Sequence, residues 1–318
     1  MKKCVILDDY QGAALPSADW SRIADRVAVS SIREYLSSED EVLARIGDAD
    51  IVVVMRERTP FPARLLDRLP RLKLIVTSGM RNAAIDLAAA KARAVTVSGT
   101  ASSSAPPLEL TWALLLGLAR QIGLETGNLR RNGPWQSSVG VDLAGARLGI
   151  IGLGKIGTQV AKVAQAFGME VVAWSPNLTE ERAAAANVTL APGKESLLET
   201  SDFVTLHLVL SASTKGLIGA EDLRRMKASA FLINTARALL VDQQALMTAL
   251  EESWIGGAGL DVFEIEPLPP DHPFRRLPNV LATPHLGYVS QNNYRTYFGE
   301  AVKDIESWLA GRPLRLLE

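Results

Sequence analysis

The sequence has little cysteine, no excess of either charge and no long apolar run, and each of these absences excludes a class of protein. Cys4 is the only cysteine, so neither an internal disulfide nor a zinc site built from cysteines can form, and no metal site is predicted. The 34 Lys and Arg residues balance 35 Asp and Glu residues, which gives a formal net charge of -1. A nucleic-acid partner is therefore not expected, because no basic excess is present to neutralise phosphates.

A membrane partner is not expected either. The longest apolar stretch, Leu110–Ala119, is far shorter than the roughly 20 residues that span a bilayer. The amino terminus reaches Asp8 and Asp9 after only a few apolar residues, which indicates a first strand and its turn and not a signal peptide. We therefore expect a soluble, cytoplasmic protein.

The chain alternates between short apolar runs and helical patterns such as Glu39–Ile46 and Asp86–Ala92. Its 318 residues exceed what one hydrophobic core usually supports, so two domains are expected. The apolar runs are rich in valine and isoleucine, as in parallel strands that helices cover on both faces. The runs in the first part of the chain are Cys4–Leu7, Val27–Val29, Ile51–Met55, Leu74–Val76 and Val95–Val97.

The composition changes at Gly99–Pro107, where small polar residues and prolines predict a loop that leads into a helix. That helix, from Leu108 to about Arg120, is apolar on nearly all sides in its middle and is expected to be buried. A second series of six strands then matches a complete dinucleotide-binding sheet. The predicted strands are Leu148–Ile151, Val171–Trp174, Phe203–Leu206, Phe231–Ile233, Ala258–Leu260 and Val280–Ala282.

These patterns predict an α/β protein with two Rossmann-like, doubly wound parallel sheets, in which a cofactor domain is inserted into a flavodoxin-like substrate domain. The predicted dinucleotide-binding domain covers residues 101–288. Residues 1–100 and 289–318 form the predicted substrate domain, because the last helix, from Ser290 to Leu309, has no predicted strand after it. Closure of the two domains is expected to exclude water from the substrate.

The segment Gly152–Gly157 fits the pattern G-x-G-x-x-G directly after the predicted strand Arg147–Ile151 and at the start of a helix. Gly152 permits a tight turn, Gly154 lets the backbone approach a pyrophosphate, and Gly157 lets helix and strand pack closely. The start of the helix offers N–H groups and a positive dipole end to phosphates. The structural alternative is an ordinary corner between a strand and a helix.

Ser175 stands 23 residues after Gly152, where NAD-specific sites place an Asp or Glu that binds the ribose hydroxyls. Without that carboxylate nothing repels a 2′-phosphate, and Ser175, Asn177 or Thr179 could donate hydrogen bonds to one. Arg182 is the nearest arginine on the carboxyl side. The sequence therefore predicts NAD or NADP as the cofactor and leaves the choice open.

An arginine, a glutamate and a histidine, namely Arg237, Glu266 and His285, each follow a predicted strand. Ligands of open α/β sheets bind outside the carboxyl ends of the strands. A guanidinium can hold the carboxylate of a 2-keto acid with two hydrogen bonds. A histidine can give a proton to the carbonyl oxygen on which hydride transfer builds negative charge, and a neighbouring glutamate orients the imidazole and favours its charged form.

Further motifs accompany these residues in a definite order along the chain. Taken together they resemble the D-2-hydroxyacid dehydrogenase family over nearly the whole sequence. The resemblance implies an NAD(P)-dependent oxidoreductase that acts on the CH–OH group of small 2-hydroxy acids. The motifs are Ser78–Asn82 with Ile85–Leu87, the Glu109–Thr111 part of a helix, Gly152–Gly157, Asn234–Arg237, Asp261–Pro267 and Pro284-His285.

The resemblance also implies the roles of single residues. Arg237 becomes the substrate-binding arginine, Glu266 the partner of the histidine, and His285 the acid and base. The loop with Gly79, Met80 and Arg81 is expected to offer backbone amides to the substrate carboxylate, although Met80 and Arg81 depart from the glycine-rich loop of the family. The implied cofactor contacts are Gly152, Gly154, Lys155, Ile156, Gly157, Ser175, Leu208, Thr235, Ala236 and Asp261.

Several features keep two interpretations. Arg56 and Arg58 follow a predicted strand and, with Arg81, either recognise a phosphate or second carboxylate of the substrate or belong to a solvated loop. His207 and His272 are interpreted as structural histidines. The helical segment flanked by Trp112 and Trp135 corresponds to the part that family members use for dimerisation, which predicts a homodimer, and an internal core helix is the alternative.

The substrate is a small anionic 2-keto or 2-hydroxy acid of a phosphoglycerate type or of a glyoxylate and hydroxypyruvate type. A formate dehydrogenase is disfavoured, because that branch lacks the glutamate found at position 266. No further regulatory domain is expected after Glu318. The alternative function is an NAD(H)-sensing binding protein, like the corepressors that share this fold, with little turnover.

Overall fold

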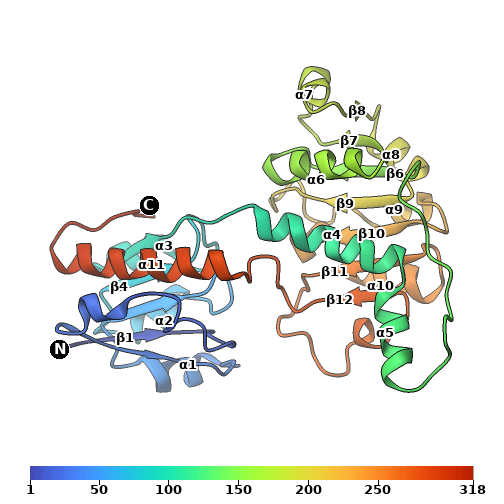
Figure 1. Ribbon diagram of the computed structural model, residues 1–318. Coiled ribbons are helices and arrows are strands. Elements are labelled where there is room, and N and C mark those ends of the chain that lie inside the picture. Colours follow the sequence, from blue (N-terminus) through green and yellow to red (C-terminus); the bar gives the residue numbers. More distant parts are fainter. Residues whose placement is uncertain (318) are drawn as a thin grey trace. The chain divides into compact units, whose positions relative to one another are not determined.

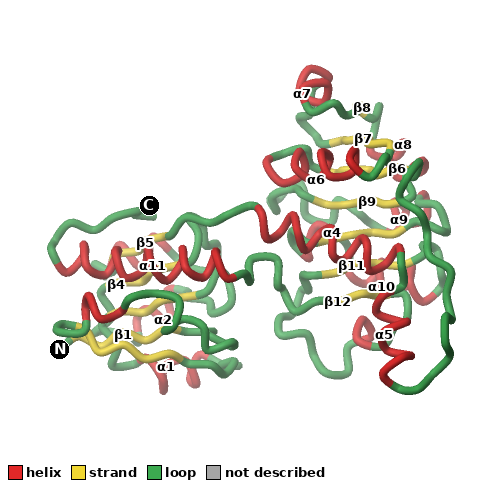
Figure 2. The backbone as a smooth tube through the Cα atoms, in the orientation of Figure 1, coloured by secondary structure: helices red, strands yellow, loops and turns green. Residues whose placement is uncertain are grey.

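The computed structural model describes residues 1–317, which form two compact units. The first unit comprises Met1–Ser103 together with the segment from Val289 onward, and the second comprises Ser104–Tyr288. Each unit contains a parallel sheet with helices packed against it (Figures 1 and 2). The second unit is thus an insertion in the first, and the predicted α/β fold class is confirmed. No helix within residues 1–317 has the length and apolar character of a membrane span.

The sheet of the first unit has five parallel strands in the order β2-β1-β3-β4-β5. This order is that of the flavodoxin-like folds, in which β1 and β3 flank the point where the chain reverses its direction of winding. Every residue of β3 and β4 is buried, as the uninterrupted apolar runs indicate. The strands are β1 (Lys2–Ile6), β2 (Val27–Ser31), β3 (Ile51–Val54), β4 (Leu74–Thr77) and β5 (Thr96–Gly99).

Most helices of the first unit begin at a side chain that caps them, and α2, which follows Pro62, is the exception. The Oγ of Ser38 accepts the N–H of Glu41 in α1, and the carboxylate of Asp86 accepts the N–H of Ala89 in α3. The last helix packs an aromatic and aliphatic face, including Tyr297, into the unit. The helices are η1 (Trp20–Ile23), α1 (Glu39–Ile46), α2 (Ala63–Asp67), α3 (Leu87–Ala92) and α11 (Gln291–Leu309).

The sheet of the second unit has the order β12-β11-β10-β9-β6-β7-β8, the arrangement of a dinucleotide-binding sheet with one strand more. The prediction of six strands is therefore wrong. The additional strand, β8, has two residues at the sheet edge and is too short to give a periodic signal. The strands are β6 (Arg147–Ile151), β7 (Glu170–Trp174), β8 (Thr189–Leu190), β9 (Phe203–Leu206), β10 (Phe231–Asn234), β11 (Gly257–Leu260) and β12 (Val280–Ala282).

The predicted apolar helix is α4, which packs directly on the sheet of the second unit. A Cβ on Gly259 of β11 would lie 3.1 Å from the Leu114 Cβ of α4, so glycine lets the helix approach the strand. The helix ends where Gln121 adopts φ +51°, and a separate helix, α5, follows. The helices are α4 (Ala105–Ala119), α5 (Ile122–Arg130), α6 (Lys155–Ala166), α7 (Glu180–Ala185), α8 (Lys194–Thr200), α9 (Ala220–Arg225), η2 (Ala238–Leu240), α10 (Gln243–Glu251) and η3 (Pro273–Arg275).

Candidate active site

The carboxyl ends of β10, β11 and β12 lie level with one another. Asn234 of β10 pairs with Leu260 of β11, and Leu260 pairs with Ala282 of β12. The segments that follow these strands therefore leave the second unit's sheet at one edge, where ligands of open α/β sheets bind. In chain order these segments carry Arg237, Glu266 and His285.

Glu266 and His285 form a hydrogen-bonded pair. The His285 Nδ1 lies 2.6 Å from the Glu266 Oε2, and the other carboxylate oxygen accepts a 2.9 Å hydrogen bond from the N–H of Phe263. The Glu266 and His285 side chains are half-buried. Because an ionised carboxylate only accepts hydrogen bonds, Nδ1 is the donor in this pair. Nε2 is therefore the nitrogen of His285 that can exchange a proton with another molecule.

A buried carboxylate holds the turn that carries His285. Asp261, with none of its surface exposed, accepts hydrogen bonds from the Thr283 hydroxyl at 2.6 Å and from the Leu286 N–H at 2.7 Å. It also accepts the Gly287 N–H at 2.8 Å. Burial raises the pKa of Asp261, and the hydrogen bonds from the turn oppose that effect.

The backbone of His285 lies in the left-handed region, with φ +52°. A residue with a side chain adopts this region at a cost and keeps it only where its surroundings enforce it. The hydrogen bonds to Asp261 come from residues on both sides of His285 and supply that constraint. Asp261 was predicted as a cofactor contact, and its role in this turn could not be read from the motif.

A buried amide fixes the loop that carries Arg237. The Asn234 side chain, 2% exposed, donates a 3.0 Å hydrogen bond to the carbonyl of Arg237 and accepts the N–H of Ala236 at 3.1 Å. The Arg237 Nη1 donates to the Ala236 carbonyl at 2.8 Å. The hydroxyl of Thr235 lies 2.7 Å from that of Thr111 in α4. The loop is thus tied to both the sheet and α4.

The turn between β6 and α6 requires glycine at two positions. Gly152 has φ +106°, and a Cβ there would lie 2.8 Å from the carbonyl carbon of His207. A Cβ on Gly157 would collide with the carbonyl oxygen of Gly152. These contacts agree with the tight turn and the close helix packing that the motif predicts.

The start of α6 is open. A Cβ built on Gly154 meets no atom within 4 Å, and Gly154 precedes the helix without a side-chain cap. The first N–H groups of α6, those of Lys155 and Ile156 included, are therefore not covered by a capping side chain. This is the arrangement that accepts a phosphate at a helix start.

Two further predicted cofactor residues lie around this turn. The N–H of Gly152 donates to the carbonyl of Trp174 at 2.9 Å, so Ser175 follows directly beside the glycine. The N–H of Leu208 lies 2.9 Å from the Cβ position of Gly152. The structure thus divides the predicted cofactor residues between the glycine turn and the loops after β10 and β11.

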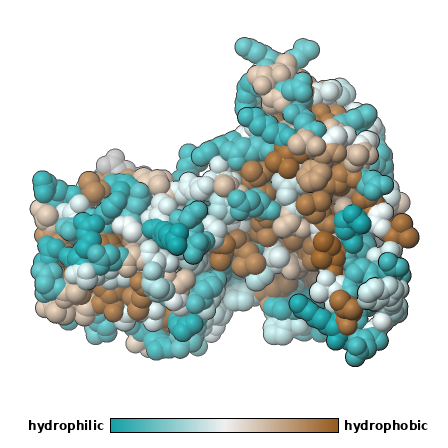
Figure 3. Space-filling model, viewed as in Figure 1, coloured by the Kyte–Doolittle hydropathy of each residue, from teal (hydrophilic) through white to brown (hydrophobic). Residues whose placement is uncertain are grey.

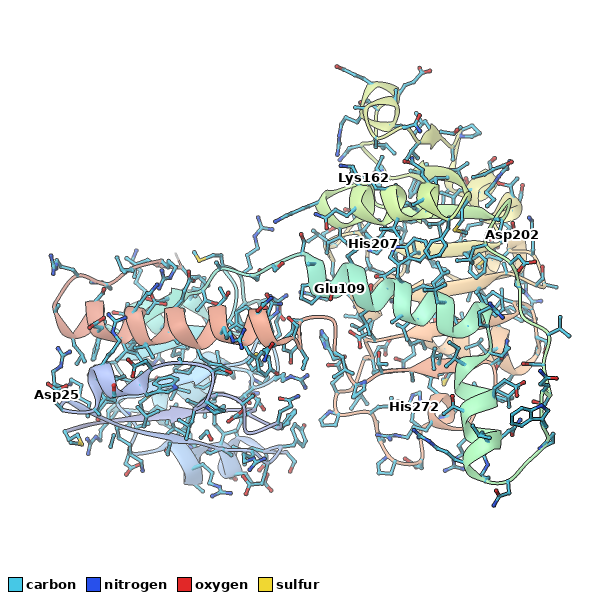
Figure 4. The ribbon with its side chains drawn as sticks, in the orientation of Figure 1. Asp25, Glu109, Lys162, Asp202, His207 and His272 are labelled. Atoms are coloured by element: carbon cyan, nitrogen blue, oxygen red, sulfur yellow. The ribbon has the colours of Figure 1, made fainter. Side chains whose placement is uncertain are left out.

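The other two histidines of the second unit have separate surroundings (Figure 4). The His207 Nε2 lies 3.0 Å from the Thr205 hydroxyl at the end of β9, and burial lowers the pKa of His207 to about 4. It is neutral near pH 7 and has no proton to donate as an imidazolium. The His272 Nδ1 accepts the N–H of Phe274 and caps η3.

The predicted substrate loop belongs to the first unit and follows β4. Gly79 is buried with φ +90°, and its N–H donates to the Thr100 hydroxyl at 3.0 Å. Met80 and Arg81 are exposed, and within residues 1–317 no group accepts a hydrogen bond from their backbone N–H groups. The amides that this loop offers to a ligand are therefore those of Met80 and Arg81. The N–H of Gly79 is already engaged.

Of the two arginines after β3, Arg56 lies close to this loop and Arg58 contacts Tyr10. The N–H of Arg56 donates to the Ser78 hydroxyl at 2.9 Å, and its Nη1 lies 2.7 Å from the Cβ position of Gly79. The Arg58 guanidinium stacks on the ring of Tyr10, 5.1 Å from its centroid. Both arginines are half-buried.

The comparisons with known proteins agree with this geometry. The family model described as "D-isomer specific 2-hydroxyacid dehydrogenase, NAD binding domain" matches residues 112–287. A D-3-phosphoglycerate dehydrogenase of Methanocaldococcus jannaschii is 37% identical over 293 residues, which cover 90% of this chain and 55% of that protein. A glyoxylate reductase of Korarchaeum cryptofilum is 37% identical over 274 residues, 84% of this chain and 81% of that one. The crystal structure of a phosphoglycerate oxidoreductase from Vibrio cholerae superposes with a TM-score of 0.93 at 34% identity and covers 98% of this chain and 100% of that chain.

Proposed function

Because the chain belongs to the D-isomer specific 2-hydroxyacid dehydrogenase family, we propose that it reduces a small 2-keto acid to the 2-hydroxy acid, and the reverse, with His285 as acid and base. It is an oxidoreductase with NAD or NADP as its cofactor. The observation that carries the proposal is the hydrogen bond between His285 and Glu266 at the carboxyl edge of the sheet. The alternative of an NAD(H)-sensing binding protein is not favoured, since the similar proteins are named as dehydrogenases and reductases.

The cofactor would be held at the turn between β6 and α6. The open position at Gly154 and the uncapped N–H groups of α6 suit a pyrophosphate. Ser175 would lie against the ribose, and the loop of Thr235 and Ala236 against the nicotinamide half. When bound, the nicotinamide supplies or accepts the hydride.

The proton passes through one nitrogen of His285. Glu266 accepts a hydrogen bond from Nδ1–H and is itself fixed by the N–H of Phe263, so Nε2 gives a proton to the carbonyl oxygen during reduction. The carboxylate also compensates the positive charge that the imidazole carries before that step. His207 is unsuited to this role because burial lowers its pKa to about 4.

Arg237 would bind the substrate carboxylate, because its planar guanidinium can donate two parallel hydrogen bonds. In the first unit, the amides of Met80 and Arg81 are the other proposed groups for binding a substrate carboxylate. Arg56 and Arg58 would favour an acid with a second anionic group, such as a phosphate. A preference for such an acid would distinguish a substrate of the phosphoglycerate type from one of the glyoxylate type.

We also propose that NADPH is accepted. Ser175 brings no negative charge to the ribose, and the Arg182 Nη1 lies 3.4 Å from the carbonyl of Asn177 in the same loop. A cation at this place would attract a 2′-phosphate. Arg182→Ala should therefore lower kcat/KM for NADPH and leave that for NADH unchanged.

A homodimer is the proposed assembly, and a second copy of the chain is the proposed partner. Hydrophobic residues gather on the face of the second unit that carries α4 and α6 (Figure 3). Beyond α4, large apolar side chains remain exposed, and Trp135 is 79% exposed. A surface of this kind is typical of an interface. The cytoplasmic location stays a prediction from the sequence.

The proposed function is tested by measuring the oxidation of NADH and of NADPH through the change in absorbance. The acids supplied are glyoxylate, hydroxypyruvate, pyruvate, phenylpyruvate and phosphohydroxypyruvate. Turnover of at least one acid is expected, and phosphohydroxypyruvate, the one acid of this set with a second anionic group, should have the lowest KM. Binding of the cofactor without turnover of any acid would contradict the proposal.

A further inference from the structure

The segment after α11 turns back and runs beside β5, the last strand of the first unit's sheet (Figure 2). The N–H of Gly99 in β5 donates to the carbonyl of Arg315, and the N–H of Leu317 donates to the carbonyl of Val97, both at 2.9 Å. Ser98 and Leu316 form an antiparallel bridge. We call residues 312–317 the C-terminal segment. It extends the parallel sheet by a short antiparallel pairing.

The C-terminal segment and the predicted substrate loop meet at Gly99. A Cβ on Gly99 would lie 2.6 Å from the carbonyl oxygen of Gly79, 2.7 Å from the Leu317 Cδ1 and 3.1 Å from the Met80 sulfur. The loop therefore rests on the end of β5, with the Leu317 side chain at the same point. Gly99 has no side chain to separate them.

Arg315 fastens the C-terminal segment to α11 and to β5. Its Nη2 lies 2.8 Å from a carboxylate oxygen of Asp304, which has none of its surface exposed. The same nitrogen donates to the carbonyl of Glu300 at 3.0 Å, and Nε donates to the carbonyl of Gly99 at 3.1 Å. One guanidinium thus joins three separate parts of the first unit.

Glu300 extends this network to the chain that leaves the first unit. Its Oε2 accepts the N–H of Ala101 at 2.6 Å. Thr100, between Gly99 and Ala101, accepts the N–H of Gly79. The position of the substrate loop is therefore set by β5 and by the residues that hold the carboxyl end of β5.

We propose that Arg315 and Leu317 are positioning residues for the substrate loop, so that the C-terminal segment sets the affinity for the 2-keto acid. This inference rests on the proposed function, in which the amides of Met80 and Arg81 bind the substrate carboxylate. A small displacement of this loop weakens its hydrogen bonds to the substrate, because the energy of a hydrogen bond depends steeply on its distance and angle. Neither residue takes part in proton or hydride transfer.

The test compares Leu317→Ala with Leu316→Ala, a neighbour whose side chain is 46% exposed and which lies next to the same strand. Leu317→Ala should raise KM for the accepted acid about fivefold or more, with little change in kcat, because the proton-transfer pair lies in the second unit. The Kd of the cofactor should not change. Leu316→Ala should resemble the unmodified protein.

Hydrogen exchange at the amide of Gly79, whose N–H donates to the Thr100 hydroxyl, supplies a readout that needs no turnover. Leu317→Ala should accelerate exchange there relative to Leu316→Ala. If the unmodified protein reduces no acid, the proposed function fails, and faster exchange would still support the positioning role. Equal exchange and equal KM in the two variants would overturn the inference.

A second pair of variants examines the guanidinium. Arg315→Ala leaves the buried carboxylate of Asp304 without its cation, which is strongly destabilising and can prevent folding. Arg315→Lys keeps the charge but not the three-way geometry, and it should fold with a raised KM and faster exchange of the Gly79 amide. Arg312→Ala, at an exposed position of the same segment, is the control and should change neither quantity. A normal KM and normal exchange in Arg315→Lys would contradict the role of Arg315.

Discussion

The two sheet edges that carry the predicted site residues, one in each unit, are held in different ways. At the edge of the second unit, carboxylates fix the reactive residues, since Asp261 binds the turn of His285 and Glu266 binds the imidazole. At the edge of the first unit, the loop of Met80 is exposed and is held by uncharged groups, such as the Thr100 hydroxyl that accepts the N–H of Gly79. The comparison indicates that charged side chains fix the turn proposed to transfer the proton, whereas uncharged contacts hold the loop proposed to bind the acid.

The largest effect is expected from the partner of the histidine. Glu266→Gln removes the negative charge that orients and compensates the imidazole, so kcat should fall about 100-fold or more. The exposed Glu264→Gln is the matched control and should keep nearly full activity. Steady-state kinetics with the accepted acid give the comparison. Similar kcat values for the two variants would mean that the edge of the second unit does not depend on this charge.

A smaller but still large effect is expected from the carboxylate beneath the turn. Asp261→Asn places an amide where the N–H groups of Leu286 and Gly287 need acceptors, so one hydrogen bond is lost and the turn of His285 shifts. We expect kcat to fall about tenfold, since misplacement of a catalytic group is costly. Asp271→Asn, at an exposed position, serves as the control. Unchanged turnover would show that the φ of His285 needs no support from Asp261.

A substitution at the predicted substrate-binding residues of the first unit should change KM more than kcat. Arg56→Ala should raise KM about tenfold for an acid with a second anionic group, because a charged hydrogen bond is lost, and kcat should change little. Arg64→Ala, whose side chain is 75% exposed, is the control. If KM remains unchanged for every accepted acid, Arg56 has no part in substrate recognition.

The smallest effect concerns stability and its dependence on pH. Burial raises the pKa of Asp304 from 3.8 to about 7, so the folded state binds this proton more tightly than the unfolded state does. Asp304 therefore contributes stability that is present below its unfolded pKa and is lost as the pH rises toward 7. Urea denaturation of the unmodified protein and of Asp304→Asn should show that the variant gains about 2 kcal/mol relative to the unmodified protein between pH 5 and pH 7. A pH-independent difference would contradict this assignment.

Much of the fold and of the second unit's edge could be predicted from the sequence, because buried parallel strands leave uninterrupted apolar runs. The glycine turn is predicted from its G-x-G-x-x-G pattern, and Arg237, Glu266 and His285 are predicted as site residues because each follows a strand. The short strand β8 has no such run, and nothing in the composition marks the left-handed Gln121 that separates α4 from α5.

Polar contacts between residues far apart in the chain could not be predicted from the sequence. The hydrogen bonds of Asp261 to the turn of His285 and the contacts of Arg315 join residues that no periodicity relates. The engagement of the Gly79 N–H by Thr100 is a further example, because it depends on the register of β4 and β5. Motifs predict which residues reach an edge, and tertiary packing decides which of their atoms remain available.

The most direct test of the central claim is the activity of His285→Gln with its cofactor binding measured on the same sample. We expect kcat to fall about 100- to 10,000-fold, the range that proton transfer by a positioned side chain contributes. The Kd of NADH should stay close to that of the unmodified protein, because the glycine turn lies on other strands. Near-normal turnover would contradict the assignment of His285 as the acid and base.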